Sequence, residues 1–312
     1  MHGDNNTAAR FAWAVLGYTV FVIVFGAWVR ITGSGAGCGQ HWPSCHGEIL
    51  HRPESMETVI ELTHRVTSAL AGFLSLGVLG IAVAQRRHRP LLWRGAALGV
   101  FFMITESLIG AGIVKFELVA DDASAARAVG VAVHLVNTAL LTAALAWAAW
   151  GARWTPANLR APSSRALWMC LACAVLMLAI MMTGAVTALG DTLFPPAHDA
   201  SPLEVLAADQ TSHAHLLERT RAIHPVVAVV GSLGLMLLYV RIGDREAGAR
   251  TSRWVRICVA FVLIQISIGV LNIWLSAPGY MQLLHLTIAT VAWIAFVRLT
   301  LSLFEPLQAH PR

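Results

Sequence analysis

Four histidines lie inside otherwise apolar segments of this chain, and their side chains are the ones best suited to chemistry. They are His64, His134, His224 and His285. An ionisable group at membrane depth is costly and is usually paired or functional, and neutral imidazole is a common ligand of haem iron. Two pairs of such histidines predict two ligand sites. The alternative for each one alone is a packing residue held by a hydrogen bond.

The composition fixes the class of protein that must position these side chains. Of 312 residues, 57% are hydrophobic and 12% are charged, and the mean hydropathy is +0.65. Such a chain is too apolar for a soluble protein and contains several runs long enough to cross about 30 Å of hydrocarbon. The sequence predicts an all-α integral membrane protein with eight transmembrane helices. Their expected ranges are 11–29, 59–84, 91–114, 128–150, 166–189, 222–240, 254–275 and 280–303.

The segments around the histidines recur in two halves of the chain. Because four predicted spans separate the copies, both halves are expected to have the same orientation, as two parallel-repeat four-helix bundles. The expected halves are residues 1–151 and 166–312, joined by a cytoplasmic linker at 152–165. The matched positions are Gly26 with Gly184, His64 with His224, Glu106 with Gln265, and His134 with His285.

The basic residues predict the orientation. Most of the 22 Lys and Arg residues fall on the inner side if both termini are cytoplasmic. The first apolar run has no small-residue cleavage site after it, and no Arg-rich, acid-poor organellar leader precedes it, so it is expected to be a retained anchor. The expected location is a bacterial cytoplasmic (inner) membrane. The net charge of +5 then reflects topology, and nucleic acid is excluded as a partner because no basic stripe carries interleaved aromatic residues.

On this topology all four histidines lie near the outer face. Each is expected about five to eight residues inward from the outer end of its span, or about 8–12 Å deep at about 1.5 Å per residue. One four-helix bundle per half could bring His64 to His134, and His224 to His285, on opposite faces of a flat macrocycle with iron between them.

The residue one helical turn before the first histidine differs between the halves. Glu61 precedes His64 on the same helix face, whereas Arg221 holds the corresponding place before His224. Glu61 could act as an acid or base, or stabilise positive charge on a substrate, and Arg221 could pair with a haem propionate. The alternative for Glu61 is an interfacial ion pair with Arg65.

Two further polar residues have open roles. Arg30, at the outer end of the first span, could neutralise a propionate, or it could extend its guanidinium to the interface like any arginine near a span end. Glu106 is buried by its position, but its repeat counterpart is Gln265, which favours a structural hydrogen bond over chemistry.

The five cysteines divide into two groups. Cys38 and Cys45 lie in the long predicted outer loop, where an oxidising compartment permits a disulfide. The other three lie in apolar spans, where packing is the expected role.

Three segments of the first half resemble the signature of the haem A synthase family. They are residues 26–38 (GAWVRITGSGAGC), residues 42–47 (WPSCHG) and residues 61–65 (ELTHR). The resemblance is dense over the first 65 residues and extends along the chain through the eight predicted spans and the four histidines. It implies that haem O is the substrate and that its C8 methyl is oxidised, through hydroxylation, to the formyl group of haem A for terminal oxidases.

The resemblance also implies roles for individual residues. His224 and His285 would be the axial ligands of a resident haem b, and His64 and His134 would hold or flank the substrate haem, with Glu61 beside the reacting group. Its implied partners are membrane lipid, haem O synthase, terminal oxidase assembly factors and an electron acceptor that the sequence does not identify.

The cysteine pair matches one branch of that family, in which a redox role has been suggested. The present chain has no second cysteine pair in the loop at 190–221, so an electron relay through two external disulfides is not expected.

A rival function, a non-enzymatic di-haem b electron carrier, explains four histidines equally well. It does not explain the asymmetry between Glu61 and Arg221. A small-molecule transporter built from parallel repeats would bind no haem.

Overall fold

The computed structural model describes residues 2–49, 51–197, 200–246 and 248–306, and this part of the chain is predominantly helical. Within it, eight helices are long and apolar enough to cross a membrane. All eight predicted spans are confirmed, with ends that differ by a few residues. The helices are α1 (His2–Ile31), α2 (Met56–Ala84), α3 (Pro90–Lys115), α4 (Ala125–Gly151), α5 (Ser164–Leu193), α8 (Ile223–Arg245), α9 (Ala249–Trp274) and α10 (Gly279–Ser302).

Serine caps explain where several helices begin. Ser55, Ser124 and Ser163 each precede a long helix and accept a hydrogen bond from a backbone N–H of its first turn. Ser201 starts the short α6 in a capping box with Glu204. These caps satisfy N–H groups that the helices leave free at the membrane boundary. The remaining short elements are α6 (Pro202–Asp209), α7 (Leu216–Arg219) and the 3₁₀ turns η1 (Ser34–Ala36), η2 (Pro156–Asn158) and η3 (Thr220–Ala222).

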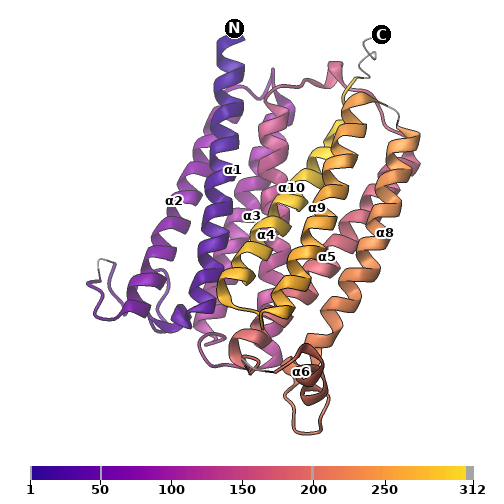
Figure 1. Cartoon of the computed structure of the whole chain (residues 1–312). Helices are drawn as coiled ribbons and strands as arrows, with labels where there is room; N and C mark the ends of the chain where they lie inside the picture. Colours follow the sequence, from indigo (N-terminus) through magenta and orange to yellow (C-terminus); the bar gives the residue numbers. More distant parts are fainter. Residues whose placement is uncertain (1, 50, 198–199, 247, 307–312) are drawn as a thin grey trace.

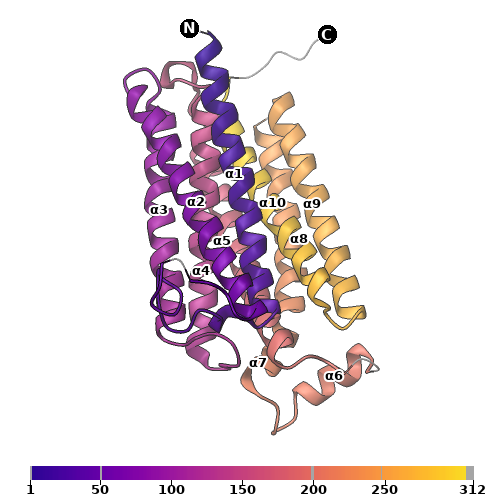
Figure 2. The ribbon, with the colours of Figure 1, turned by 90° about the vertical axis from the view of Figure 1, so that its left-hand side faces the viewer.

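The long helices form one bundle with two unlike ends. The start of α1 and the end of α10 lie together at the upper end in Figure 1. The opposite end carries the two long connections, one between α1 and α2 and one between α5 and α8 that contains α6. Figure 2 shows α2 and α3 on one side of the molecule and α8 and α9 on the other.

Two clusters of buried side chains hold the bundle together. One lies among α1, α2, α3 and α4 and includes Leu92 and Leu145. The other lies mainly among α5, α8, α9 and α10 and includes Tyr239 and Phe296. The helices α4 and α10 pack together between them, and the indole N–H of Trp293 donates to the carbonyl of Ala139 across this seam at 2.8 Å. The division into two domains and their relation as a parallel repeat stay predictions.

Glycine allows a close helix contact in the first half. A Cβ built at Gly95 of α3 would lie 2.5 Å from the backbone nitrogen of Ala148 in α4. Small residues at such crossings let two backbones approach within a membrane. The tight α3–α4 pair fixes the rotation of α4, which carries His134.

Candidate functional site

The first histidine of each half lies against a glycine of the preceding long helix. A Cβ built at Gly26 in α1 would be 2.9 Å from Cε1 of His64 in α2. A Cβ built at Gly184 in α5 would likewise be 2.9 Å from Cε1 of His224 in α8. No side chain fits between ring and helix at these distances, so glycine is what lets each imidazole lie against its neighbour.

The second histidine of each half makes a looser version of the same contact. A Cβ at Gly110 would lie 3.8 Å from Cε1 of His134, and one at Gly269 would lie 3.3 Å from Cε1 of His285. The four histidines thus come from α2, α4, α8 and α10, and each faces a glycine of the long helix before it. The same kind of contact therefore occurs at both pairs of positions that the sequence matched.

In the second half the two predicted ligands face each other. The ring centres of His224 and His285 are 6.4 Å apart and their planes are nearly perpendicular, at 86°. Two imidazoles on opposite faces of one metal ion place their nitrogens about 4 Å apart, given metal–nitrogen bonds of about 2 Å, and their ring centres roughly 6 Å apart. The observed separation fits this arrangement.

Hydrogen bonding at His224 also fits a ligand site. The Nδ1 atom of His224 is hydrogen-bonded with the hydroxyl of Thr183, at 3.1 Å, whereas the buried Nδ1 atom of His285 has no hydrogen-bond partner within the described residues. A partner on one ring nitrogen orients an imidazole whose other nitrogen binds a metal. The donor set suits haem iron, which takes neutral imidazole as an axial ligand.

In the first half, the two predicted ligands are His64 on α2 and His134 on α4. The ring of Phe25 meets that of His64 edge-on, with centres 5.8 Å apart. The Nδ1 atoms of both histidines are buried and lack a hydrogen-bond partner in the described ranges. Both histidines of the first predicted pair thus have an unpaired ring nitrogen, and an aromatic ring lies beside His64.

A contact between Glu106 and this first pair was not predicted from the sequence. Oε1 of Glu106 in α3 lies 3.5 Å from Nε2 of His134 in α4. The amide of Asn137 donates to Oε2 of Glu106 at 2.6 Å, and the hydroxyl of Thr138 donates to Oε1. The predicted structural hydrogen bonding of Glu106 is present, and in addition its carboxylate is aimed at a candidate ligand.

The matched position in the second half approaches its histidine differently. The side-chain amide of Gln265 donates to the backbone carbonyl of His285, at 3.0 Å. The match between Glu106 and Gln265 in the two halves was the only sequence feature that pointed to these positions. It did not reveal their contacts with His134 and His285, because each contact joins two neighbouring helices.

The carboxylate of Glu61 is buried, with 3% of its surface exposed, and is held on both oxygens. The backbone N–H of Cys38 donates to Oε2 at 2.7 Å, and the guanidinium of Arg65 forms an ion pair with Oε1. Arg65 also donates to the carbonyls of His41 and Ser44, at 2.5 and 2.6 Å. The alternative expected for Glu61, a pair with Arg65, is therefore present, and its catalytic role stays a prediction.

Cys38 and Cys45 form a disulfide, which confirms that prediction. The loop they close packs on the start of α2, where the Thr58 hydroxyl donates to the Gly37 carbonyl at 2.6 Å. Through its bond to Glu61, the loop is attached to the helix that carries His64. Cys45 also lies within 4.8 Å of two imidazoles, but its sulfur is already bonded and too few ligands are left for a structural zinc site.

Arg30 links the two halves at the end of the bundle that carries the disulfide. Its guanidinium donates to the Ala188 carbonyl at 2.6 Å, to the Thr192 hydroxyl at 2.5 Å and to Oε1 of Gln282 at 3.0 Å. These partners lie on α5 and α10, whereas Arg30 is on α1. Propionate contact by Arg30 stays a prediction, and any propionate there would share the guanidinium with these groups.

Arg221 is also bonded within the protein. Its guanidinium forms ion pairs with Asp191 at 2.7 Å and with Asp209 at 2.6 Å, and donates to the carbonyl of Phe194 at 2.7 Å. Both carboxylates are buried. Arg221 thereby fastens the connection that contains α6 to the end of α5. The pairing of Arg221 with a propionate stays a prediction.

The fold and these contacts define a class: an eight-span helical membrane protein with two pairs of partly buried histidines, one of which has its ring centres 6.4 Å apart. Residues 9–297 match the sequence profile of the COX15-CtaA family, described as cytochrome oxidase assembly protein, and the chain belongs to this family.

Relatives of two kinds are similar to the chain. It is 42% identical over 302 residues to a protein named protoheme IX farnesyltransferase in each of two strains of Thermus thermophilus, a match covering 95% of this chain and 48% of the relative. A heme A synthase of Exiguobacterium is 38% identical over 98 residues, 31% of this chain and 33% of the relative. One from Bacillus cereus is 40% identical over 95 residues, 30% of each chain. The chain thus spans about half the length of the Thermus relatives.

Proposed function

We propose that this chain is a haem A synthase, which oxidises the C8 methyl of haem O to a formyl group. The proposal rests on membership in a cytochrome oxidase assembly family and on similarity to proteins named heme A synthase. The single observation that carries the chemistry is the pair His224 and His285, whose rings are 6.4 Å apart and nearly perpendicular. A spacing of this kind suits two axial ligands of one iron.

We assign the two histidine pairs different tasks. His224 and His285 would hold a resident haem b, which when bound supplies one-electron transfer. His64 and His134 would hold the substrate haem O. The asymmetry between the pairs supports this division, because Glu106 places a carboxylate 3.5 Å from His134, whereas the matched Gln265 is a neutral amide.

The chain's own residues would orient the substrate and handle protons. Glu106 accepts hydrogen bonds from Asn137 and Thr138, which fix its carboxylate beside His134. Glu61 is a buried carboxylate of the first half, and its bonds to Cys38 and Arg65 hold the outer loop over α2. A carboxylate fixed beside the reacting methyl could accept the protons that its oxidation releases. The apolar helices around the macrocycle limit access of water and side reactions.

We further propose that the protein lies in the bacterial cytoplasmic membrane with both termini inside and the histidine pairs near the outer face. The charge pattern supports this, because the short connections at the end that carries the start of α1 are rich in arginine. The disulfide lies at the opposite end, which suits an oxidising compartment.

A physical partner is suggested by the longer Thermus relatives. Their name describes transfer of a farnesyl group to protohaem, and a segment of each resembles nearly the whole of this chain. We propose that a separate farnesyltransferase hands its haem product to this chain, with terminal oxidase assembly factors receiving haem A. Surrounding lipid and an electron acceptor of unknown identity complete the set of partners.

Extraction of haems from a host that makes haem O but no haem A tests the enzymatic function. Expression of this chain should produce haem A, detected by chromatography and by the mass of the formyl derivative. Two b haems bound to the purified protein, with no haem A in the cells, would instead support the electron carrier. Absence of any haem absorbance would favour a transporter.

A further inference from the structure

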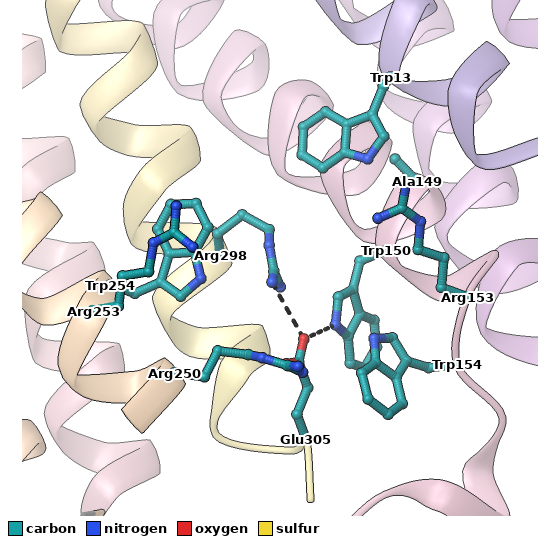
Figure 3. Close-up of a pocket in the computed structure, with 10 residues that line it drawn as sticks. All are labelled: Trp13, Ala149, Trp150, Arg153, Trp154, Arg250, Arg253, Trp254, Arg298 and Glu305. Carbon is teal, nitrogen blue, oxygen red and sulfur yellow. Dashed lines mark hydrogen bonds and ion pairs between the residues drawn. The ribbon is translucent and has the colours of Figure 1, made fainter. Parts of the chain in front are cut away.

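A cavity of about 440 Å³ lies at the end of the bundle opposite the disulfide, on the seam between the halves. Figure 3 shows the side chains that line it. Its walls come from the start of α1, the ends of α4 and α10 and the start of α9. Four arginines and four tryptophans line it, with Glu305 as the one carboxylate among the lining residues. The volume is within the range of small-ligand sites, about 300–1,000 Å³.

The cavity has an excess of positive charge. Glu305 is buried and already engaged, because its carboxylate accepts a hydrogen bond from the Trp150 indole at 2.7 Å and pairs with Arg250 and Arg298. Arg153 and Arg253 also line the cavity and have no acidic partner among the described residues. One carboxylate therefore faces four guanidinium groups.

One of the arginines that line the cavity has an unpaired donor atom. The Nη1 atom of Arg298 is buried and has no hydrogen-bond partner in the described part of the chain. A buried charged donor left unpaired is costly. A ligand that accepts hydrogen bonds would remove this cost.

Aromatic rings hold the guanidinium groups in place. Arg250 lies over the ring of Trp154 at 5.8 Å, and Arg298 lies over that of Trp254 at 5.2 Å, both measured to the ring centre. Cation–π contacts of this kind favour a fixed guanidinium plane. Tryptophan is also enriched at the depth of lipid headgroups. The cavity thus combines fixed anion-binding groups with a position at the membrane interface.

We propose that this cavity binds the phosphate of an anionic phospholipid headgroup. Guanidinium forks match phosphate oxygens in two-point hydrogen bonds, and basic pockets between transmembrane helices at the cytoplasmic side suit anionic headgroups. The bound phosphate would bridge arginines of α9 and α10 to Arg153, just after α4. The lipid would join the two halves at the end remote from the histidines. This inference does not depend on the proposed enzymatic function.

Native mass spectrometry of the purified full-length protein tests the proposal, with dioleoyl phosphatidylglycerol as the probe and dioleoyl phosphatidylcholine as the neutral comparison. The test variant combines Arg153→Gln with Arg253→Gln, since both side chains are exposed and have no described ion pair to lose. The matched control combines Arg86→Gln with Arg87→Gln, which removes the same charge from exposed positions between α2 and α3.

We expect selective retention of phosphatidylglycerol by the protein and by the control variant. One basic residue near an anionic lipid contributes about fivefold in affinity, so the test variant should bind about 25-fold more weakly. Arg298→Lys provides a second variant, which keeps the charge beside Glu305 but removes the fork, and it should also bind more weakly.

Three outcomes would overturn the proposal. They are equal retention of both lipids, equal weakening in the test and control variants, and unchanged binding in both the test variant and Arg298→Lys. A competition arm with glycerol 1-phosphate separates the two sources of phosphate. Displacement of the lipid only by other anionic lipids supports a headgroup, whereas efficient displacement by the soluble phosphate ester would overturn the lipid as the occupant.

Discussion

Replacement of Gly184 by alanine should weaken haem binding in the second half without touching a ligand. The added Cβ would lie 2.9 Å from Cε1 and 3.3 Å from Nε2 of His224, whereas carbon atoms pack at about 3.5–4.0 Å. The ring must then move by about half an ångström, which is the tolerance of a preorganised site. Without ligand the ring can turn away, but with iron it must face His285, so the strain opposes binding.

The size of the effect follows from the cost of overpacking. Such insertions cost about 1–3 kcal/mol, which corresponds to about 5- to 150-fold weaker haem retention. Alanine also favours helix over glycine by up to about 1 kcal/mol, so a control must carry the same substitution without the contact. Gly80→Ala in α2 provides it, because nothing lies within 4 Å of the Cβ it would add.

The assay measures the haem content per protein and the reduced-minus-oxidised absorption spectrum. Both variants are measured while they are diluted or while a competitor removes haem. Gly184→Ala should lose the low-spin b-type spectrum at haem concentrations that still saturate Gly80→Ala. If Gly184→Ala retains haem as tightly as the control, His224 does not bind iron in this position, and the ligand assignment fails.

Three further predictions concern other parts of the molecule. Thiol reagents applied to intact cells should modify Cys38 and Cys45 only after reduction, and labelling without reductant would show that the disulfide is absent. Replacement of both cysteines by serine should lower the free energy of unfolding by about 2 kcal/mol, because the loop that the disulfide closes is short. Glu61→Gln should sharply reduce haem A formation while the second-half haem spectrum persists, as read by haem chromatography at matched protein level; near-normal haem A would leave Glu61 as a structural partner of Arg65. Burial raises the pKa of Glu246, but hydrogen bonds from Ser163 and Arg160 outweigh it, so the pKa lies below its ordinary value. The contribution of Glu246 to stability is then present at neutral pH and is lost as the pH falls through that depressed pKa. Glu246→Gln should therefore flatten the acid limb of a plot of unfolding free energy against pH. An unchanged acid limb would refute the contribution of Glu246 to the pH dependence.

Much of the fold was predictable because the membrane imposes strong rules on sequence. Hydrocarbon thickness requires long apolar runs, so all eight helices could be located from hydropathy. The histidines were conspicuous because imidazole is rare in such runs, and Cys38 and Cys45 were paired because both fell in one outer loop. These features depend on local composition.

The contacts that the sequence did not reveal run between helices. The approach of Glu106 to His134 depends on the rotation of α3 against α4, and the bonds of Arg30 to Thr192 and Gln282 depend on how the halves meet. Periodicity gives the face of one helix but not the depth and rotation of its neighbour. The cavity around Glu305 has the same origin, since four helix ends must meet before it exists.

The central claim is that the two histidine pairs do different work, and one comparison tests it directly. His134→Ala and His285→Ala are expressed at matched levels in a host that makes haem O, and haem A in the cells and haem b in the purified protein are measured together. His134→Ala should keep the low-spin haem b and lose haem A, whereas His285→Ala should lose or alter the haem b spectrum. Loss of haem b in His134→Ala with its full retention in His285→Ala, or normal haem A in both variants, would contradict the account.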